Sequence, residues 1–239
     1  MDKIGNILLT LYWAHKQGAG TVIYLVDRRN RDAFEAQLEE MYRQRHRVYV
    51  EKRGWKALAR PDGREIDQFD NASAVYLMKL AESGSVEGAV RLIPTNKPHL
   101  MRDVFPHVVT LGAIPNDEKI YEMTRCYVSE AVTDKHQRTL AAGELLAAQL
   151  EYGLAKGLTD YSVVSDMYFL PIMLALGDGV HKLGEPYEYG EGTCMALTFP
   201  INEIGLKMCR RGRGLSGPVL VYSPTPPPGA MFENDKIAA

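Results

Sequence analysis

The 239-residue chain has few cysteines, no long apolar run and no excess of either charge. Its three cysteines, Cys126, Cys194 and Cys209, lie far apart and never form a CxxC pair, which argues against a disulfide framework or a zinc site and favours a reducing cytoplasm. Cys126 and Cys194 lie in apolar runs and are expected in the core. The 28 basic and 30 acidic residues are too balanced for a dedicated nucleic-acid binder.

Membrane and common enzyme motifs are also missing. The apolar run at residues 7–14 is too short for a membrane span, which needs about 20 residues. No small-residue cleavage site follows it, so a segment packing on the domain, or an upstream start codon, is expected rather than a signal peptide. The chain has no GxGxxG after a strand, no Walker loop, no HExxH and no GxSxG, so no motif assigns a nucleotide, metal or serine-hydrolase site.

Hydrophobic periodicity predicts a mixed α/β (α+β) domain. Asp32 and Glu35 have the spacing of a capping box that opens a helix ending near residue 50, and Asp134 and Gly157 bracket a second helix over 135–156. Shorter helices are expected at 167–176 and 202–211. Strands are expected at residues 22–26, 74–82, 86–93, 119–128, 160–165, 180–189 and 193–200.

Charged residues inside apolar surroundings are the most informative feature. Arg45 falls on the apolar stripe of the first helix and must find a partner there, either in an internal ion pair or in a ligand. Residues 51–73 form a long polar loop with Trp55 and an acidic group, and long loops are often functional. Together the charges predict a buried ionic network, structural or catalytic. Its candidate members are Arg45, Asp67, Asp70, Arg91, Glu122 and Arg125.

The order and spacing of these residues resemble those of the acyl-homoserine-lactone synthase (autoinducer synthase) family from about residue 22 to residue 221. The resemblance implies a fold like that of the GCN5-related acetyltransferases, a three-layer sandwich whose twisted mixed sheet has a V-shaped cleft. It divides the chain into an N-terminal extension (1–21) and the synthase domain (22–222). The proline-rich, polar composition of residues 223–239 predicts a disordered tail. The matching motifs are Arg45-x3-Tyr49-x5-Trp55, Glu65-x-Asp67-Gln-Phe-Asp70, Val90-Arg-Leu-Ile-Pro-Thr95, Met101-x3-Phe105 and Glu122-x2-Arg125.

This resemblance implies an acyltransferase whose substrates are S-adenosylmethionine and an acyl thioester of coenzyme A or acyl carrier protein. The amine attacks the thioester, and the methionyl carboxylate then displaces methylthioadenosine to close a lactone. Neither a cofactor nor a metal is expected. The implied catalytic residues are Glu122, Arg125, Asp67, Asp70 and Arg91. Arg45, Tyr49, Trp55 and Phe105 are implied to bind S-adenosylmethionine, and Met123, Ser162, Leu146, Met167 and Phe169 the acyl chain.

Each implied role has a physical reason. Glu122 would be the general base that removes a proton from the amine, and the acidic and aromatic residues would suit the sulfonium. Arg45 and Arg91 would pair with the acids and orient the substrate carboxylate. Residues three apart on a regular strand face opposite sides, so Glu122 and Arg125 need a bulge to meet in one site. Tyr49 stands where the family usually has Phe, and its hydroxyl needs a partner.

The sequence leaves open the identity of the acyl donor and several alternative functions. The helix at 167–176 has no Lys or Arg to meet an acidic carrier protein, which favours acyl-coenzyme A. Ser162 stands where a Thr accompanies 3-oxo chains in the family, which favours an unsubstituted chain or a relaxed preference at C3. An ordinary acetyltransferase would need a glycine-rich pyrophosphate loop that residues 129–143 lack. The remaining alternatives are an N-acyl amino acid synthase on the same fold and a non-catalytic binding module.

Overall fold

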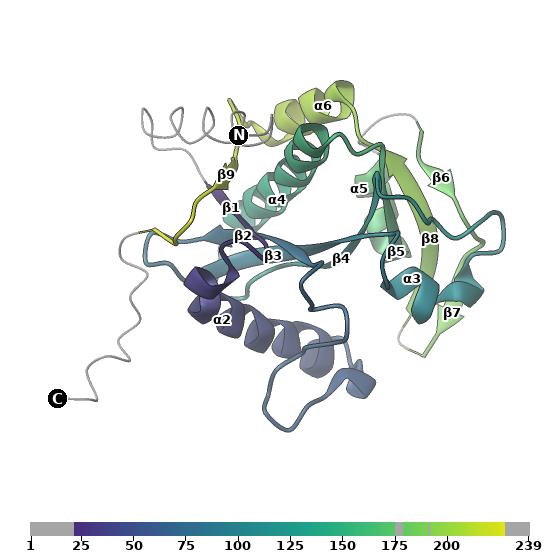
Figure 1. Ribbon diagram of the computed structural model, residues 1–239, viewed down its shortest axis with the longest axis horizontal. Helices are drawn as coiled ribbons and strands as arrows, with labels where there is room; N and C mark the ends of the chain where they lie inside the picture. Colours follow the sequence, from purple (N-terminus) through teal and green to yellow (C-terminus); the bar gives the residue numbers. More distant parts are fainter. Residues whose placement is uncertain (1–21, 175–178, 191, 228–239) are drawn as a thin grey trace.

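One mixed sheet forms the centre of the protein in the computed structural model, which describes residues 22–174, 179–190 and 192–227. In that part of the chain the strand order is β6-β8-β5-β4-β3-β2-β1-β9, and β7 pairs with β8 (Figure 1). The strands are β1 Ile23–Val26, β2 Val75–Leu80, β3 Val86–Pro94, β4 Ile120–Val128, β5 Asp160–Asp166, β6 His181–Lys182, β7 Tyr187–Tyr189, β8 Gly192–Pro200 and β9 Leu220–Tyr222.

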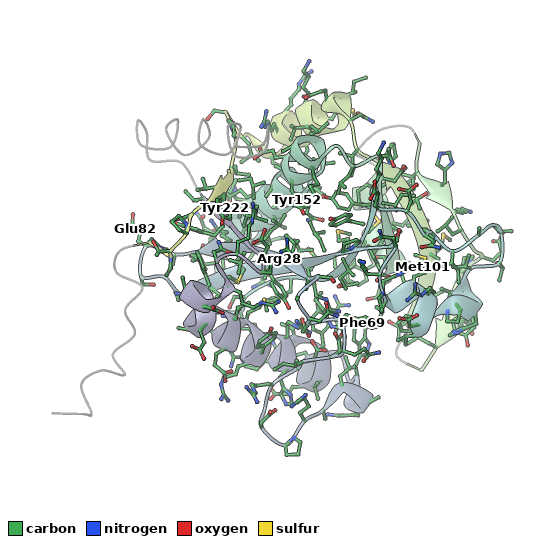
Figure 2. All side chains as sticks on the ribbon, in the orientation of Figure 1. Arg28, Phe69, Glu82, Met101, Tyr152 and Tyr222 are labelled. Atoms are coloured by element: carbon green, nitrogen blue, oxygen red, sulfur yellow. The ribbon has the colours of Figure 1, made fainter. Side chains whose placement is uncertain are left out.

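Helices cover both faces of this sheet (Figure 1). Strand residues alternate between the faces, as the two-residue period of a strand requires: Leu25 and Leu77 join the core under α4 and α6, whereas Val26 and Tyr76 join the core under α2. Side chains fill the space on either side (Figure 2). The α-helices are α2 Glu35–Arg45, α3 Leu100–Asp103, α4 Lys135–Lys156, α5 Leu170–Leu174 and α6 Glu203–Arg213.

Short helical turns complete the chain. A π-helical turn, η2 His46–Lys52, extends α2, and 3₁₀ turns occur at η1 Arg31–Phe34, η3 Lys56–Leu58, η4 Pro106–Val108 and η5 Met167–Phe169.

The sheet opens between β4 and β5. These parallel strands pair only where Ile120–Glu122 meets Asp160–Ser162, although both continue further. Beyond Glu122 they separate, which gives the V-shaped cleft and confirms the expected three-layer sandwich. Glu122 and Ser162 are the last pair before the opening, so the geometry of the sheet places both at the base of the cleft.

Local signals located most elements. Asp134 accepts a hydrogen bond from the Gln137 amide and Gly157 ends α4 in the left-handed region with φ 72°, as expected. The prediction of a capping box at Asp32 was wrong. A 3₁₀ turn, η1, precedes α2, and no side chain caps the start of η1 or of α2. Instead, Asn30 donates its amide to the carbonyls of Leu25 and Ser223, joining β1 to the segment after β9.

Two further expectations concern the cysteines and the ends of the chain. Cys194 is buried as expected, but Cys126 is exposed, which corrects the prediction. The apolar run at 7–14 and most of the tail lie outside the described residues. Among the helices that the structure does describe, none has the length and apolarity needed to cross a membrane. The cytoplasmic location stays a prediction.

Candidate active site

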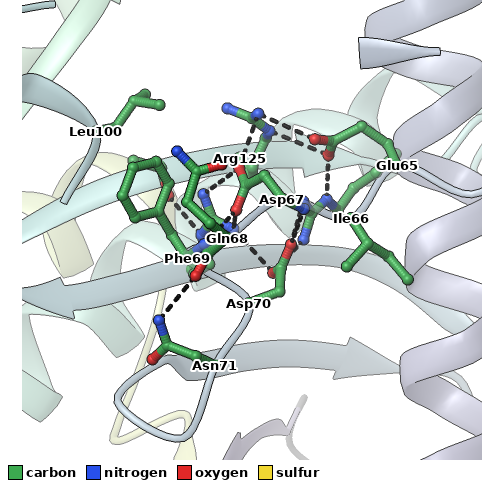
Figure 3. Close-up of polar contacts among 12 residues, drawn as sticks. Glu65, Ile66, Asp67, Gln68, Phe69, Asp70, Asn71, Leu100 and Arg125 are labelled. Atoms are coloured by element: carbon green, nitrogen blue, oxygen red, sulfur yellow. Dashed lines mark hydrogen bonds and ion pairs between the residues drawn. The ribbon is translucent and has the colours of Figure 1, made fainter. Parts of the chain in front are cut away.

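Three arginines and three carboxylates form one buried network beside the cleft (Figure 3). The loop between η3 and β2 brings its acidic residues against α2 on one side and against β3 and β4 on the other. Numbers of positive and negative charges match, so the network is neutral as a whole. Its members are Arg45, Arg91, Arg125, Glu65, Asp67 and Asp70.

Arg45 is held entirely by acids of this loop. Its Nη1 and Nη2 atoms donate to the two oxygens of Asp70 at 2.8 and 2.9 Å, and its Nε donates to Glu65 at 2.5 Å. The Arg45 side chain is 1% exposed. Each of its three nitrogens therefore already has a protein acceptor, and the ion-pair interpretation of Arg45 is confirmed.

Arg91 and Arg125 converge on Asp67. Arg91 donates Nη1 and Nη2 to Asp67 at 2.6 and 2.9 Å and Nε to the Thr124 hydroxyl at 3.0 Å. Arg125 donates Nε and Nη2 to Glu65 and also Nη2 to Asp67. Within the described part of the chain, Nη1 of Arg125 has no hydrogen-bond acceptor, unlike every guanidinium nitrogen of Arg45 and Arg91.

Arginine charges keep the loop carboxylates ionised. Burial would raise the pKa of Glu65, but Arg45 and Arg125 lower that pKa to about 2. Burial likewise opposes ionisation of Asp70, and the charges of Arg45 and Arg91 hold its pKa well below the usual range. Buried charges that are paired and hydrogen-bonded in this way avoid the large penalty of an isolated ion.

The bulge that Glu122 and Arg125 require is present in β4. Pairing with β3 shifts so that Ala89 faces Tyr127 but Arg91 faces Thr124, which leaves one extra residue in β4. Arg125 has φ 54° and is the single non-glycine residue with positive φ in the described chain. Such a conformation is strained for a residue with a side chain and is found at functional sites. It directs Arg125 into the network and turns Cys126 outward.

Glu122 lies next to the network in a different environment. It is 0% exposed, and its two oxygens accept the amides of Leu100 and Met101 at 2.7 and 2.6 Å. Burial raises its pKa to about 7, while these two hydrogen bonds and the charges of Arg91 and Arg125 lower it. A carboxyl group whose pKa lies near 7 can both accept and donate a proton at physiological pH.

The aromatic pair implied for S-adenosylmethionine is formed. Tyr49 and Trp55 stack with ring centroids 5.2 Å apart, and the Arg125 guanidinium lies 5.4 Å from the Tyr49 ring. The Tyr49 hydroxyl, absent from the usual Phe, donates to the Cys126 carbonyl at 3.1 Å. Phe105 is not part of this pair, because it packs with Met101 and Val108 in a separate cluster.

The residues implied for the acyl chain are Ser162 on β5 and four apolar residues of one core cluster. Ser162 is fully buried, and its hydroxyl has no hydrogen-bond partner among the residues that the structure describes. The four apolar members share the core under α4 and α6: Met123, Leu146, Met167 and Phe169. Their role in binding an acyl chain stays a prediction, as do the roles of the charged residues.

Several contributors to the site were missed from the sequence. Glu65 was noted only as part of an acidic loop, yet it bridges Arg45 and Arg125. Its place in Glu65-x-Asp67, with the side chain on the same side as Asp67, was the available signal. Nothing in the sequence indicated that the Tyr76 hydroxyl bonds Asp70 or that backbone amides bind Glu122.

Comparisons with known proteins agree on one family. Residues 30–208 match the family described as autoinducer synthase. An isovaleryl-homoserine lactone synthase from Bradyrhizobium diazoefficiens is 37% identical over 180 residues, 75% of this chain and 80% of that protein.

Solved structures give the same result. A CoA-dependent acyl-homoserine lactone synthase, BjaI, solved with SAM and isopentyl-CoA, is 34% identical with a TM-score of 0.78, covering 88% of this chain and 97% of that one. The CoA-dependent synthase MesI is 35% identical with a TM-score of 0.74, covering 83% of this chain and 98% of that one. The chain therefore belongs to the autoinducer synthase family and is an acyltransferase that forms N-acyl-homoserine lactones.

Proposed function

We propose that this enzyme transfers an acyl group without a 3-oxo substituent from acyl-coenzyme A to the amine of S-adenosylmethionine and closes the product to a lactone. The observation that carries the chemistry is Glu122, a fully buried carboxylate with a pKa near 7 at the base of the cleft. The α-amino group it would deprotonate has an ordinary pKa of about 8, so the proton passes between groups of similar affinity.

Amide formation then follows directly. The free amine attacks the thioester carbonyl, the nitrogen–carbon bond forms, and the carbon–sulfur bond of the thioester breaks. The departing coenzyme A sulfur takes up the proton that the nitrogen loses, and in this proposal Glu122 relays that proton. The Ser162 hydroxyl has no partner in the described part of the chain, and Ser162 pairs in register with Glu122. Both observations support a hydrogen bond from this hydroxyl to the thioester carbonyl.

Lactonisation needs no further base. The methionyl carboxylate attacks its own γ-carbon, a carbon–oxygen bond forms, and the carbon–sulfur bond breaks toward the sulfonium, which leaves as neutral methylthioadenosine. We assign the carboxylate to Arg125, because its Nη1 is the guanidinium nitrogen that the network leaves available. Arg45 and Arg91, whose nitrogens already donate to the protein, act as positioning residues.

Two findings support coenzyme A as the carrier. The 34% and 35% identical structural neighbours are both CoA-dependent synthases. The segment from Met167 to Leu174, which the structure describes as η5 and α5, has no Lys or Arg to meet the acidic surface of a carrier protein. The isovaleryl specificity named for the 37% identical relative makes short branched chains the first ones to test.

The test compares kcat/KM for one acyl chain on both carriers and then compares chains on the better carrier. We expect coenzyme A thioesters to be preferred, and isovaleryl-CoA to exceed a 3-oxo-acyl-CoA. A tenfold preference for the carrier-protein thioester, about 1.4 kcal/mol in transition-state binding, would contradict the donor assignment. Acylated product without release of methylthioadenosine would instead identify an N-acyl amino acid synthase.

A further inference from the structure

Arg53 links the two sides of the cleft. It follows η2 at the start of the loop that carries the acidic residues, and it reaches a segment more than a hundred residues away. Its Nη1 donates to Asp166 at 2.5 Å, and its Nη2 donates to the Tyr168 hydroxyl. Arg53 pairs with Asp166 and does not belong to the ionic network of Arg45, Arg91 and Arg125.

Four aromatic rings surround its guanidinium. The central carbon of Arg53 lies 5.5 Å from the Tyr49 ring, 5.6 Å from Trp55, and 5.7 Å from both Tyr168 and Phe169. All four distances fall within the roughly 6 Å at which a cation is attracted to a ring face. We call these four side chains the aromatic box; it takes two rings from each side of the cleft.

Asp166 adds a negative charge to this box. Its second oxygen accepts a hydrogen bond from the Tyr189 hydroxyl, so the carboxylate stays fixed when Arg53 moves. The Arg53 side chain is 24% exposed and that of Asp166 is 17% exposed, which leaves the box accessible to a ligand. Aromatic rings with an adjacent carboxylate are the surroundings that recognise methylated ammonium groups, and a sulfonium has the same charge and a similar shape.

We propose that the aromatic box and Asp166 form the site of the S-adenosylmethionine sulfonium, and that Arg53 fills this site in the free protein. The inference rests on the proposed function. It adds Asp166 and Tyr168 to the site of S-adenosylmethionine, and it assigns Phe169 to this site instead of to the acyl chain. The sulfonium would be repelled by the Arg53 guanidinium if both lay between the four rings, so the substrate displaces the guanidinium. Arg53 is therefore an internal competitor that lowers the affinity for the cationic substrate.

The experiment measures calorimetric Kd values for two ligands that differ in charge at sulfur. S-adenosylmethionine carries the sulfonium, whereas S-adenosylhomocysteine has a neutral thioether. The variants are Arg53→Gln, which removes the internal cation, and Lys52→Gln, a matched control. Lys52 is the neighbouring cation and pairs with Glu130 outside the box. A thermal unfolding curve of each variant establishes that it is folded, and Arg53→Lys provides a second, charge-retaining variant.

We expect Arg53→Gln to bind S-adenosylmethionine about tenfold more tightly and S-adenosylhomocysteine less than threefold more tightly, with Lys52→Gln and Arg53→Lys closer to the wild type. Adding Asp166→Asn to Arg53→Gln should weaken S-adenosylmethionine binding severalfold. Weaker or unchanged binding in Arg53→Gln, equal gains for both ligands, or the same gain in Lys52→Gln would overturn the inference. Lactone formation by the wild type is measured in parallel, so that failure of the proposed function is seen separately.

Discussion

Glu122 and Glu65 show how neighbouring carboxylates acquire opposite properties. Both are almost completely buried. Glu65 accepts hydrogen bonds from two arginines, which stabilise its charge and lower its pKa. Glu122 accepts hydrogen bonds from two neutral backbone amides, which compensate only part of the free-energy cost of removing its charge from water. At the residue scale, the difference between a structural ion and a candidate base is therefore set by the charge of the donors.

Replacing Glu122 tests its role as the base. Glu122→Gln is expected to lower the rate of amide formation by roughly 10²–10⁴-fold, the usual contribution of a positioned acid–base group. Single-turnover acylation of S-adenosylmethionine measures this rate, and unchanged substrate affinity is the control. Near-normal turnover in the folded variant would remove Glu122 from the role, whereas an unfolded variant would indicate a structural one.

The same residue predicts a pH dependence of stability. The folded pKa of Glu122 is about 7, above its ordinary value, so the folded state binds the proton more tightly than the unfolded state. The stability that Glu122 contributes is therefore present in full below about pH 4.5 and is lost as the pH rises through about 7. Between pH 5.5 and 8 this group lowers the free energy of unfolding by up to about 2 kcal/mol.

Denaturant unfolding of the wild type and of Glu122→Gln at both pH values measures this effect. The other groups, including buried His99, whose pKa burial lowers, are common to both proteins and cancel in the difference. We expect the variant to lack the fall. Parallel pH profiles for the two proteins would show that Glu122 does not titrate in this range.

At the element scale, the loop that follows η2 has two unlike halves. Its second half is held by hydrogen bonds: the Glu65 amide donates to the Tyr42 carbonyl, and the amides of Asp67 and Phe69 donate to side chains of the loop. Its first half, around Lys56 to Asp62, is mostly exposed. A ligand held at Trp55 would therefore order the first half only.

Hydrogen exchange with and without saturating S-adenosylmethionine tests this difference. We expect amides of residues 54–63 to become protected on binding, and amides of residues 65–70 to be protected already in the free protein. The last two turns of α4, distant from the loop, serve as the internal reference. Unchanged exchange in residues 54–63 would contradict a role of this loop in covering the substrate.

Gly88 lies where β3 packs closely against β4 and α4, so a larger side chain at this position tests that packing. A Cβ at Gly88 would lie 2.8 Å from the Tyr127 carbonyl oxygen and 3.1 Å from Leu145. Gly88→Ala is expected to lower the free energy of unfolding by about 1–3 kcal/mol, as overpacking does. Gly112→Ala is the control, since nothing lies within 4 Å of its Cβ. Equal stability of both variants in urea would contradict the expectation.

At the scale of the whole molecule, the ionic network connects the helix α2 to the central sheet. Arg45 comes from α2, Arg91 from β3 and Arg125 from β4, and all three meet on one loop. Because the pKa values of Glu65 and Asp70 are lowered, the stability that these carboxylates contribute is present above pH 4.5 and is lost as pH falls toward 2.

The substitution Asp70→Asn tests how much this ionic connection contributes to stability. It leaves Arg45 and Arg91 short of a negative charge, and breaking a buried pair costs about 3–5 kcal/mol. We expect that loss in the free energy of unfolding at pH 7, and a shrinking difference from the wild type as the pH approaches 2. The measurement is urea unfolding across this pH range. A difference that stays constant with pH would indicate that the lost packing, rather than the charge, stabilised the wild type.

The sequence by itself determined the local features, which depend on residues close together along the chain. The period of apolar residues located most strands, but it missed β9, and the strand expected at 180–189 is instead two short strands, β6 and β7. Asp134 and Gly157 fixed the ends of α4, and the apolar stripe around Arg45 required a partner for its charge. The ordered motifs also indicated the family and the residues gathered at the site. These features follow from backbone geometry over a few residues, which is why they can be read along the chain.

Only the tertiary structure decided which groups meet and what charge they carry. Arg45 meets Glu65 and Asp70 across 20 and 25 residues, and Arg53 meets Asp166 across 113. The positive φ of Arg125 and the exposure of Cys126 depend on a bulge that the spacing required but could not place. The pKa of Glu122 depends on burial and on amides from α3, because a charge is stabilised by whatever surrounds it in space.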